Sequence, residues 1–243
     1  MISAIIQARV SSTRLPNKVF ANLGGKPLLF HVVDRLKKSI YLDSIIIATT
    51  DNVADNSIEQ WASTNEIPCF RGSEYNVLKR YYDTAKHYKV KTIVRITADD
   101  PFKDYQVMDN VINQFISQEA DLACNNFPPS YPEGLDVEVF SFAALETAYR
   151  NSCTDFEMEH VTQYFYQNKS NFKIVTIDPI KDLSDLRWTI DTLEDLEMTR
   201  KIYSKFTKRK SIYLMEDILK ILSDNPEISK INGSVKRSEM YKS

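Results

Sequence analysis

Glycine is scarce in this chain, and its scarcity removes two common phosphate-binding motifs. The 243 residues include five glycines. No Gly-x-x-x-x-Gly-Lys-Ser/Thr sequence is present, and the first apolar run is not followed by Gly-x-Gly-x-x-Gly. Gly24-Gly25-Lys26 lacks the upstream glycine and the following hydroxyl. A phosphate site in this chain would therefore depend on side chains as well as on backbone N–H groups.

Cysteine and histidine are also sparse, which argues against a metal centre made from them. Cys69, Cys124 and Cys153 are far apart and form no Cys-x-x-Cys pair. We interpret them as reduced thiols that pack inside a cytosolic protein. The three histidines do not supply zinc-ligand spacing with these cysteines either. A zinc site is therefore not expected.

Charge and apolar runs set further limits. The chain carries 31 Lys and Arg against 33 Asp and Glu, a net charge of -2, so no global basic field attracts nucleic acid. No apolar run approaches the roughly 20 residues that span a bilayer, and the N-terminus enters a strand-like run without a signal-like leader. With 43% hydrophobic residues, we expect a globular cytoplasmic protein with no membrane or nucleic-acid partner.

Apolar runs of strand length alternate with segments of helical period in the first half of the chain. Helices are expected at 27–38, 54–63, 76–88 and 104–118. Strands are predicted around them at Ile2–Ile6, Ser44–Ala48, Cys69–Phe70, Thr92–Ile96 and Asp121–Cys124. This succession predicts an α/β fold with a mainly parallel, Rossmann-like sheet.

The pattern changes after Asn125, where a proline-rich loop covers residues 126–134. Further helices are expected at 142–150, 157–167, 193–206 and 214–222. Further strands are expected at Leu135–Phe140, Phe172–Ile177 and Arg187–Ile190. We find no internal repeat and no low-complexity linker. The simplest organisation is one domain over residues 1–206, followed by a C-terminal helical extension over 207–243.

A polar loop follows the first strand directly. Ligands of open α/β sheets gather at the carboxyl ends of the strands, which is where this loop lies. Arginine binds phosphate oxygens in pairs and keeps its charge. The loop is therefore a candidate phosphate cradle, although a solvated basic loop explains its charge equally well. Its three cations and three hydroxyls belong to Arg9, Arg14, Lys18, Ser11, Ser12 and Thr13.

Acidic residues follow two other strand-like runs. Asp99 and Asp100 come directly after the run at 92–96 and its short polar end, and Asp191 ends the run at 187–190. Carboxylates at strand ends face the ligand crevice, and one or two of them plus phosphate oxygens are usual Mg²⁺ ligands. We predict that Asp99 and Asp191 share one Mg²⁺. Either Asp99 or Asp100 is expected instead to cap the next turn, and Asp195 to cap a helix.

A third acidic group lies in and after the proline-rich region. Side chains at alternating strand positions share one face, and carboxylates on such a face can hydrogen-bond sugar hydroxyls. A solvated strand face is the alternative, and it is slightly favoured for Glu138 taken alone. The predicted substrate-binding residues are Glu133, Asp136, Glu138, Glu159 and His160.

Several ordered motifs resemble one known family. The stretch Ala-Arg-x-x-Ser-Thr-Arg-Leu-Pro-x-Lys from Ala8 to Lys18 is similar to the N-terminal signature of the CMP-sugar cytidylyltransferases. This family includes the 3-deoxy-manno-octulosonate (Kdo) and acylneuraminate cytidylyltransferases and the SpsF-like proteins of spore coat polysaccharide biosynthesis. The likeness covers residues 1–205 and continues in order through 23–28, 47–50, 70–74, 77–82, 94–99, 131–140, 159–162 and 186–191.

The resemblance implies a fold of the nucleotide-diphospho-sugar transferase type. It also implies Mg²⁺-dependent transfer of CMP from CTP to a sugar-like acceptor, an acidic sugar or a sugar phosphate, with release of pyrophosphate. Arg9, Lys18 and Asp99 would be catalytic, with Arg14 assisting at the phosphates and Asp191 completing the Mg²⁺ site. The nucleotide site would include these first-loop and Asp99 positions together with Ile6, Gln7, Ala8, Ser11, Ser12, Thr13, Thr49, Arg71 and Arg80; Arg71 and Arg80 would also face the acceptor.

Two departures from the family pattern concern the acceptor. Asp100 stands where a cysteine is common, and Asn76 where an acid is common; an extra acid can change metal number or acceptor preference. Three other functions stay open: a sugar-1-phosphate nucleotidylyltransferase using another NTP, a GT-A-type glycosyltransferase and a non-catalytic interaction protein. The aromatic residues Tyr164, Phe165 and Tyr166 are compatible with a homodimer face and equally with core packing.

Overall fold

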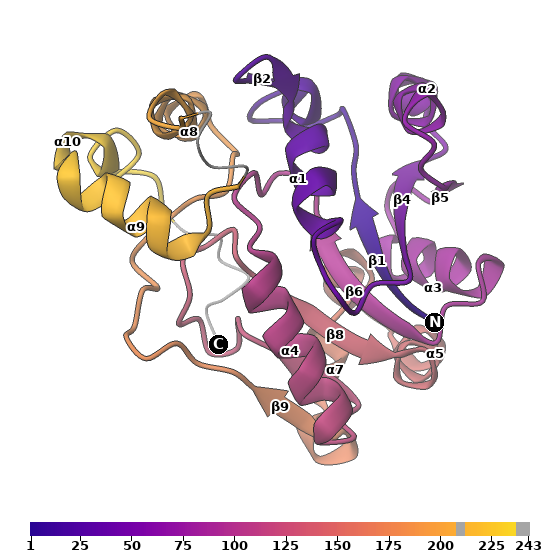
Figure 1. Ribbon diagram of the computed structural model, residues 1–243. Helices are drawn as coiled ribbons and strands as arrows, with labels where there is room; N and C mark the ends of the chain where they lie inside the picture. The colour runs from indigo at the N-terminus through magenta and orange to yellow at the C-terminus, as the bar shows by residue number, and fades with distance from the viewer. Residues whose placement is uncertain (208–211, 237–243) are drawn as a thin grey trace.

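The computed structural model describes residues 1–207 and 212–236 and is built around a seven-stranded sheet (Figure 1). Its strands are β1 (Ile2–Gln7), β4 (Ser44–Thr50), β5 (Cys69–Gly72), β6 (Thr92–Thr97), β7 (Leu122–Cys124), β8 (Glu138–Ser141) and β9 (Ile174–Thr176). Their order is β5-β4-β1-β6-β8-β7-β9, and only β8 runs antiparallel to its neighbours. The mainly parallel α/β sheet predicted from the sequence is confirmed.

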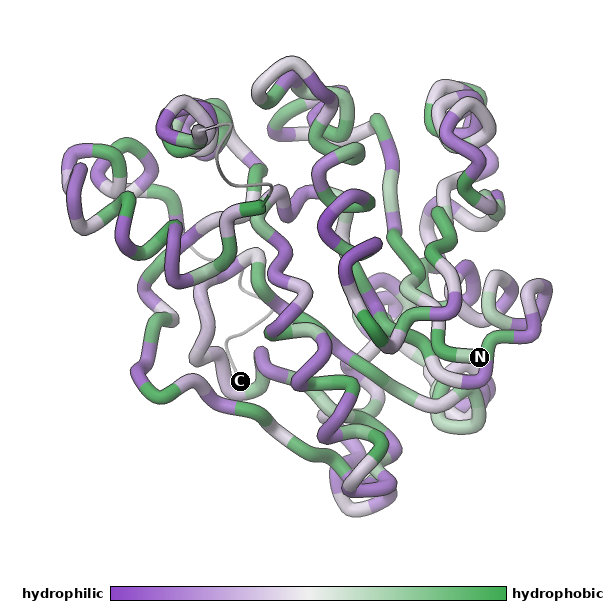
Figure 2. The backbone as a smooth tube through the Cα atoms, viewed as in Figure 1, coloured by the Kyte–Doolittle hydropathy of each residue, from purple (hydrophilic) through white to green (hydrophobic). Residues whose placement is uncertain are grey.

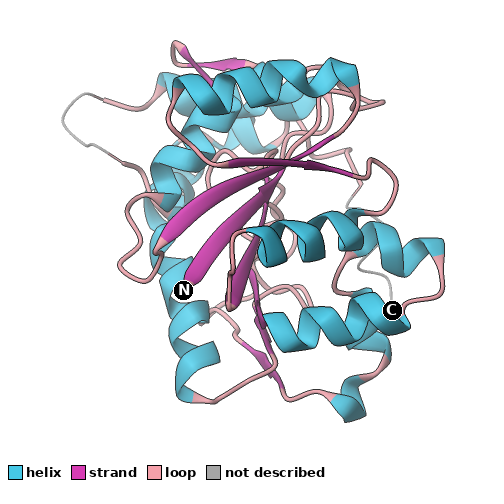
Figure 3. Ribbon diagram, turned by 90° about the vertical axis from the view of Figure 1, so that its right-hand side faces the viewer, coloured by secondary structure: helices cyan, strands magenta, loops and turns pink. Residues whose placement is uncertain are grey.

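Helices cover both faces of the sheet (Figure 3). The central strands β1 and β6 are rich in β-branched residues that are buried on both faces, as a covered parallel sheet requires. The helices are α1 (Leu28–Leu36), α2 (Asn56–Thr64), α3 (Val77–His87), α4 (Tyr105–Ser117), α5 (Phe142–Asn151), α6 (Asp155–His160), α7 (Gln163–Gln167), α8 (Leu193–Ser204), α9 (Met215–Asp224) and α10 (Pro226–Ser229). Short elements are 3-10 turns η1 (Lys18–Phe20), η2 (Val53–Asp55) and η3 (Lys169–Asn171), and a hairpin of β2 (Asn22–Leu23) and β3 (Lys26–Pro27).

Three predicted elements differ from the structure. The run 187–190 is not a strand: it forms one isolated bridge, between Glu133 and Arg187, because its neighbours are loops that offer no continuous ladder. The helix predicted over 157–167 is divided into α6 and α7 by Val161, whose φ of +55° is left-handed. The strand predicted over 135–140 begins only at Glu138.

Hydrophobic residues follow the central strands and the inner sides of the helices (Figure 2). A separate apolar cluster joins α9 and α10 to the body, with Ile218, Leu222 and Ile228 packed among Phe102 and Trp188. None of the helices among the described residues is long and apolar enough to cross a membrane. The aromatic segment in α7 contributes Phe165 and Tyr166 to the core. A boundary at residue 206 stays a prediction.

Candidate active site

A cleft of about 410 Å³ opens at the carboxyl ends of β1 and β6, where the sequence predicts ligand binding. The loop after β1, the turn after β6 and the segments 133–138 and 189–191 meet there. Most of the predicted site residues line it, namely Gln7, Ala8, Arg9, Ser12, Thr13, Arg14, Lys18, Arg80, Asp99, Glu133, Asp136, Glu138, Glu159, His160 and Asp191.

Lys18 is buried and joins the two predicted metal ligands. Its Nζ lies 2.7 Å from Asp99 Oδ2 and 2.7 Å from Asp191 Oδ1, and it donates to the carbonyl of Ile190 over 2.9 Å. Burial alone would lower the pKa of Lys18, but the two carboxylates outweigh it and the pKa is raised. Burial would raise the pKa of Asp99, but Lys18 outweighs it and the pKa falls to about 2. Lys18 and Asp99 are therefore both charged near neutral pH.

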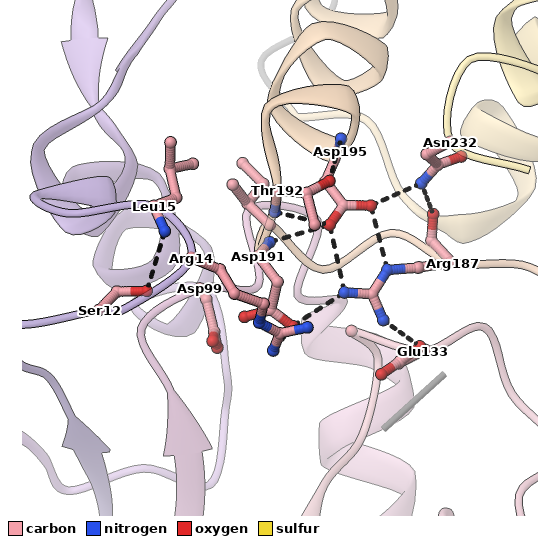
Figure 4. Close-up of polar contacts among 12 residues, drawn as sticks. Ser12, Arg14, Leu15, Asp99, Glu133, Arg187, Asp191, Thr192, Asp195 and Asn232 are labelled. Atoms are coloured by element: carbon pink, nitrogen blue, oxygen red, sulfur yellow. Dashed lines mark hydrogen bonds and ion pairs between the residues drawn. The ribbon is translucent and has the colours of Figure 1, made fainter. Parts of the chain in front are cut away.

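Asp191 is also held by two arginines (Figure 4). Its Oδ2 lies 2.9 Å from Arg14 Nη2 and 2.8 Å from Arg187 Nη2. Arg14 is exposed, whereas Arg187 is buried and has two further carboxylate partners, Glu133 at 2.6 Å and Asp195 at 3.0 Å. Burial opposes the charge of Arg187, but the bonds to Asp195 and Glu133 raise its pKa. One guanidinium therefore links three carboxylates.

Asp195 is the buried carboxylate that holds both Arg187 and the backbone at Asp191. It is fully buried, and its Oδ2 accepts the backbone N–H groups of Asp191 and Thr192 over 3.0 Å each. Thr192 and Asp195 form a capping box that begins α8, so the predicted capping role of Asp195 is confirmed. The prediction that either Asp99 or Asp100 starts the next turn is confirmed for Asp100, whose carbonyl accepts the Lys103 N–H over 3.3 Å. The helix that follows, α4, is capped by Asp104.

The backbone brings Asp99 and Asp191 together. Ile190 N–H donates to the Asp99 carbonyl over 2.9 Å, which ties the segment 187–191 to the turn after β6. Gly134 packs against the same segment with a φ of +107°, and a Cβ there would lie 2.8 Å from Thr189 N. Only glycine allows both this conformation and this close approach. The two carboxylates are therefore placed by main-chain contacts as well as by Lys18.

Arg9 and Arg80 lie along another part of the cleft and lack carboxylate partners. Arg80 is buried, its Nη1 donates to the Ser73 carbonyl over 2.7 Å, and its Nε has no partner. Neither arginine forms an ion pair with any residue in 1–207 or 212–236. Burial lowers the pKa of Arg80, and the charge of Arg9 lowers it further. The buried Gln7 Oε1 is likewise unpartnered. This part of the cleft therefore suits an anionic ligand with several acceptor oxygens.

Glu138 lines the cleft but is fully engaged within the protein. Its carboxylate pairs with Arg95 and accepts hydrogen bonds from Thr162 at 2.8 Å and Tyr166 at 2.6 Å. Burial would raise the pKa of Glu138, but these partners outweigh it and the pKa is lowered. The interpretation of Glu138 as part of a solvated strand face is wrong, because its partners balance its charge in the interior.

The other polar residues of the cleft differ in how far their side chains are exposed to solvent. Asp100 is buried and accepts from Lys103 Nζ over 2.8 Å and from Thr97 over 2.6 Å. Burial and the charge of Asp99 raise the pKa of Asp100, against the effect of Lys103. Glu159 is exposed and His160 is half-buried, and burial lowers the pKa of His160. The polar atoms of Glu159 and His160 are thus accessible from the cleft.

Four predicted nucleotide-site residues do not line the cleft. Ile6 and Thr49 are buried in the sheet, and Ser11 donates to Glu74 over 3.1 Å. Arg71 pairs with Glu59 at 2.9 Å and donates to backbone carbonyls beside β4. The side chains of Ser11 and Arg71 are engaged away from the cleft, and those of Ile6 and Thr49 are enclosed in the sheet, the Thr49 hydroxyl without a partner. Ligand binding at these four positions would need their backbone groups or a rearrangement.

The sequence interpretation missed several residues of the site. Arg187 and Arg95 hold the carboxylates of Asp191 and Glu138, and Asn232 bonds to Asp195. Arg187 had a signal, because a cation inside an apolar run and four residues before an acid needs a buried partner. Asn232 had none, since nothing in its local sequence indicates contact with residues some forty positions away.

Asp99 and Asp191 also fit a divalent cation. Their oxygens converge on one point, which Lys18 Nζ occupies. Mg²⁺ is usually held by one or two carboxylates and completed by water and phosphate oxygens. Within the described parts of the chain, no group of three or more His, Cys, Asp or Glu side chains is arranged to hold a metal unaided. The donor set therefore suits a Mg²⁺ that arrives with a phosphate ligand.

Comparison with known proteins agrees with this geometry. A family model described as cytidylyltransferase matches residues 3–232. The spore coat polysaccharide biosynthesis protein SpsF of Bacillus subtilis is 32% identical over 230 residues, 92% of this chain and 94% of that protein. A 3-deoxy-manno-octulosonate cytidylyltransferase of Pelobacter propionicus is 28% identical over 115 residues, 47% of this chain and 44% of that protein. The structure of a cytidylyltransferase from Leptospira borgpetersenii superposes with a TM-score of 0.89 at 31% identity, covering 94% of this chain and 96% of that one. The chain belongs to the cytidylyltransferase family.

Proposed function

We propose that this protein transfers CMP from CTP to a sugar-like acceptor, an acidic sugar or a sugar phosphate, and releases pyrophosphate. An acceptor oxygen attacks the α-phosphorus and forms a new P–O bond, while the bond from that phosphorus to the oxygen bridging the β-phosphate breaks. The observation that carries the proposal is one cleft in which the Lys18–Asp99–Asp191 cluster adjoins the unpaired Arg9 and Arg80. Family membership supports CTP as the nucleotide.

The cations of the cleft would each bind the triphosphate in a different way. Arg80 Nε has no partner, and neither Arg9 nor Arg80 forms an ion pair within the described residues, so both would bind phosphate oxygens without breaking one. Arg14 is exposed and can turn from Asp191 toward the leaving pyrophosphate. Lys18 lines the same cleft and is held by the carboxylates of Asp99 and Asp191. One preorganised charge contact of this kind contributes about 10²–10³ in rate.

Asp99 and Asp191 would hold Mg²⁺, which when bound would polarise the α-phosphate. Lys18 would then release the carboxylates and donate to a phosphate oxygen instead. The backbone at Gln7 and Ala8, at the end of β1, would contact the base.

The acceptor would lie against the acidic part of the cleft. Asp136, Glu159 and His160 line it and can accept hydrogen bonds from sugar hydroxyls, whereas Glu133 and Glu138 shape this wall through their buried arginine partners. Similarity to SpsF supports cell-surface polysaccharide biosynthesis as the setting.

A pyrophosphate-release screen tests the proposal. The purified protein is given Mg²⁺ and each of four NTPs with 3-deoxy-ulosonic acids, nonulosonic acids or sugar phosphates. We expect acceptor-dependent pyrophosphate with CTP and a CMP-containing product by mass spectrometry. Pyrophosphate with another NTP and a sugar 1-phosphate would identify a different nucleotidylyltransferase. Release of a nucleoside diphosphate from a nucleotide sugar would identify a glycosyltransferase, and failure to bind CTP would contradict the proposal.

A further inference from the structure

Asn232, which follows α10 near the end of the described chain, reaches the network beneath the active site. Its side chain is 5% exposed. Its Nδ2 donates to Asp195 Oδ1 over 2.9 Å and to the Arg187 carbonyl over 3.1 Å (Figure 4). Neither Asn232 nor Asp195 lines the cleft. Asn232 therefore acts on the site only through the residues that it holds.

The hydrogen bonds lead from Asn232 to the Asp191 carboxylate through two intermediate residues, Asp195 and Arg187. Asp195 Oδ1 accepts from Asn232 and from Arg187 Nε, while Asp195 Oδ2 lies 3.2 Å from Arg187 Nη2. The same Nη2 donates to Asp191 Oδ2 over 2.8 Å. One arginine nitrogen is thus shared between the two carboxylates. If Asn232 stops donating, Asp195 Oδ1 keeps Arg187 Nε as its donor, so the fully buried carboxylate depends more strongly on Arg187.

We propose that Asn232 is a positioning residue for the Asp191 carboxylate, which makes the segment after α10 part of the active-site architecture. By donating to Asp195, it lets the shared Arg187 Nη2 keep its shorter bond to Asp191, at 2.8 Å against 3.2 Å to Asp195, and so hold Asp191 in the orientation that also meets Lys18. This inference rests on the proposed function, since Asp191 is its metal ligand. The apolar cluster that packs α9 and α10 around Trp188 keeps Asn232 in place next to Arg187.

Two variants distinguish a role of Asn232 in positioning Asp191 from a role in the general stability of the fold. Asn232→Ala removes the bond to Asp195. Asn225→Ala, at the junction of α9 and α10, removes a local bond to the carbonyl of Ile221 over 2.9 Å. Outer-shell partners of metal ligands typically contribute 10–100-fold to metal affinity, and Asn232 is one step further out, so we expect about 3–10-fold. The expected result is a rise of that size in half-saturating Mg²⁺ for Asn232→Ala only. KM for CTP at saturating Mg²⁺ stays unchanged.

Metal binding is also measured without turnover. Mn²⁺ is titrated into the protein–CTP complex without acceptor, and bound ion is followed by electron paramagnetic resonance. We expect the same loss of affinity for Asn232→Ala, a smaller loss for Asn232→Ser, which keeps one hydroxyl donor, and wild-type affinity for Asn225→Ala. If Asn232→Ala does not fold, Asn232→Ser against Asn225→Ala makes the same comparison.

The outcomes distinguish this inference from the function on which it rests. A wild-type protein that binds CTP and Mn²⁺ while both asparagine variants keep wild-type metal affinity overturns the role of Asn232 alone. Equal loss of metal affinity in Asn225→Ala also overturns it, because the segment then acts only by general stability. A wild-type protein that binds no Mn²⁺ with CTP and releases no pyrophosphate overturns the proposed function and this inference together.

Discussion

The two parts of the cleft treat charge in opposite ways. Around Asp191, carboxylates and cations are matched at 2.6–3.0 Å, with Lys18 and Arg187 each shared between two or more acids. Around Arg80, the guanidinium is buried with a single backbone carbonyl and faces a second arginine, Arg9. In the first part the charges already have oppositely charged partners without a ligand, whereas in the second part the two arginines have no carboxylate partner.

The difference indicates what each part contributes. A matched network is stabilised in the ligand-free protein, so losing a member costs both stability and activity. A buried cation without a counter-charge carries a desolvation cost that a bound anion returns. Substitution of an unpaired arginine should therefore reduce ligand binding and turnover with little loss of stability.

The largest expected effect contrasts Asp99→Ala with Arg9→Ala. Asp99→Ala removes a carboxylate that we propose as a Mg²⁺ ligand, and Arg9→Ala removes a cation that we place on the phosphates. Each should lower kcat by at least about 10²-fold. Only Asp99→Ala should also lower Tm, because it leaves the buried Lys18 with one carboxylate fewer. Pyrophosphate release and thermal unfolding of both variants check this. Near-normal release from both would refute the assigned roles, and an equal fall in Tm would refute the contrast.

A second pair tests the contrast by stability alone. Arg95→Met leaves Glu138 without its buried cation and should destabilise the fold by about 3 kcal/mol, even though Thr162 and Tyr166 still donate to it. Arg80→Met removes a buried charge that has no ion pair, so the free energy of unfolding should stay within about 1 kcal/mol of wild type.

Urea unfolding measures both values, and calorimetry with CTP supplies the other half of the test. We expect Arg80→Met to fold well and to bind CTP at least tenfold more weakly, which corresponds to about 1.4 kcal/mol. A strongly destabilised Arg80→Met would show that Arg80 has a structural role instead.

The layout of the site was predictable from the sequence because strand ends carry positional information. The apolar runs before Gln7 and Asp99 mark β1 and β6, and parallel strands deliver their C-terminal loops to one edge. Asp195 was predicted to cap α8 from its spacing to Thr192, since a capping box is a local motif.

What could not be predicted depends on contacts between distant segments. Whether Glu138 faces solvent or the interior depends on Arg95, on the neighbouring antiparallel strand. The segment 187–190 has a strand-like composition but lies among loops, which a pattern of apolar residues does not reveal. Arg71 has the chemistry of a phosphate ligand and instead pairs with Glu59 on α2.

A smaller effect is expected at Gly134, whose backbone packs against the segment that carries Asp191. Gly134 and Gly25 both have positive φ, but only at Gly134 would a Cβ meet other atoms, at 2.8 Å from Thr189 N. Gly25→Ala should therefore cost about 1 kcal/mol for conformation alone, and Gly134→Ala about 2–3 kcal/mol more because the segment carrying Asp191 must move. Chemical denaturation measures both. Equal costs would show that the close approach is relieved without moving that segment.

The smallest expected effect is a shift in one titration. Asp99 has a pKa of about 2, below its ordinary value, because Lys18 outweighs the effect of burial. A lowered pKa stabilises the fold above about pH 4, and this contribution is lost as the pH falls through the folded-state value. In Lys18→Met the burial remains without the cation, so the pKa of Asp99 should rise and the loss should begin at higher pH. Carbon-13 NMR of labelled aspartates follows the titration, with the exposed Lys37→Met as the matched control. An Asp99 that titrates unchanged in Lys18→Met would mean that the matched part of the cleft does not depend on Lys18 for its charge balance.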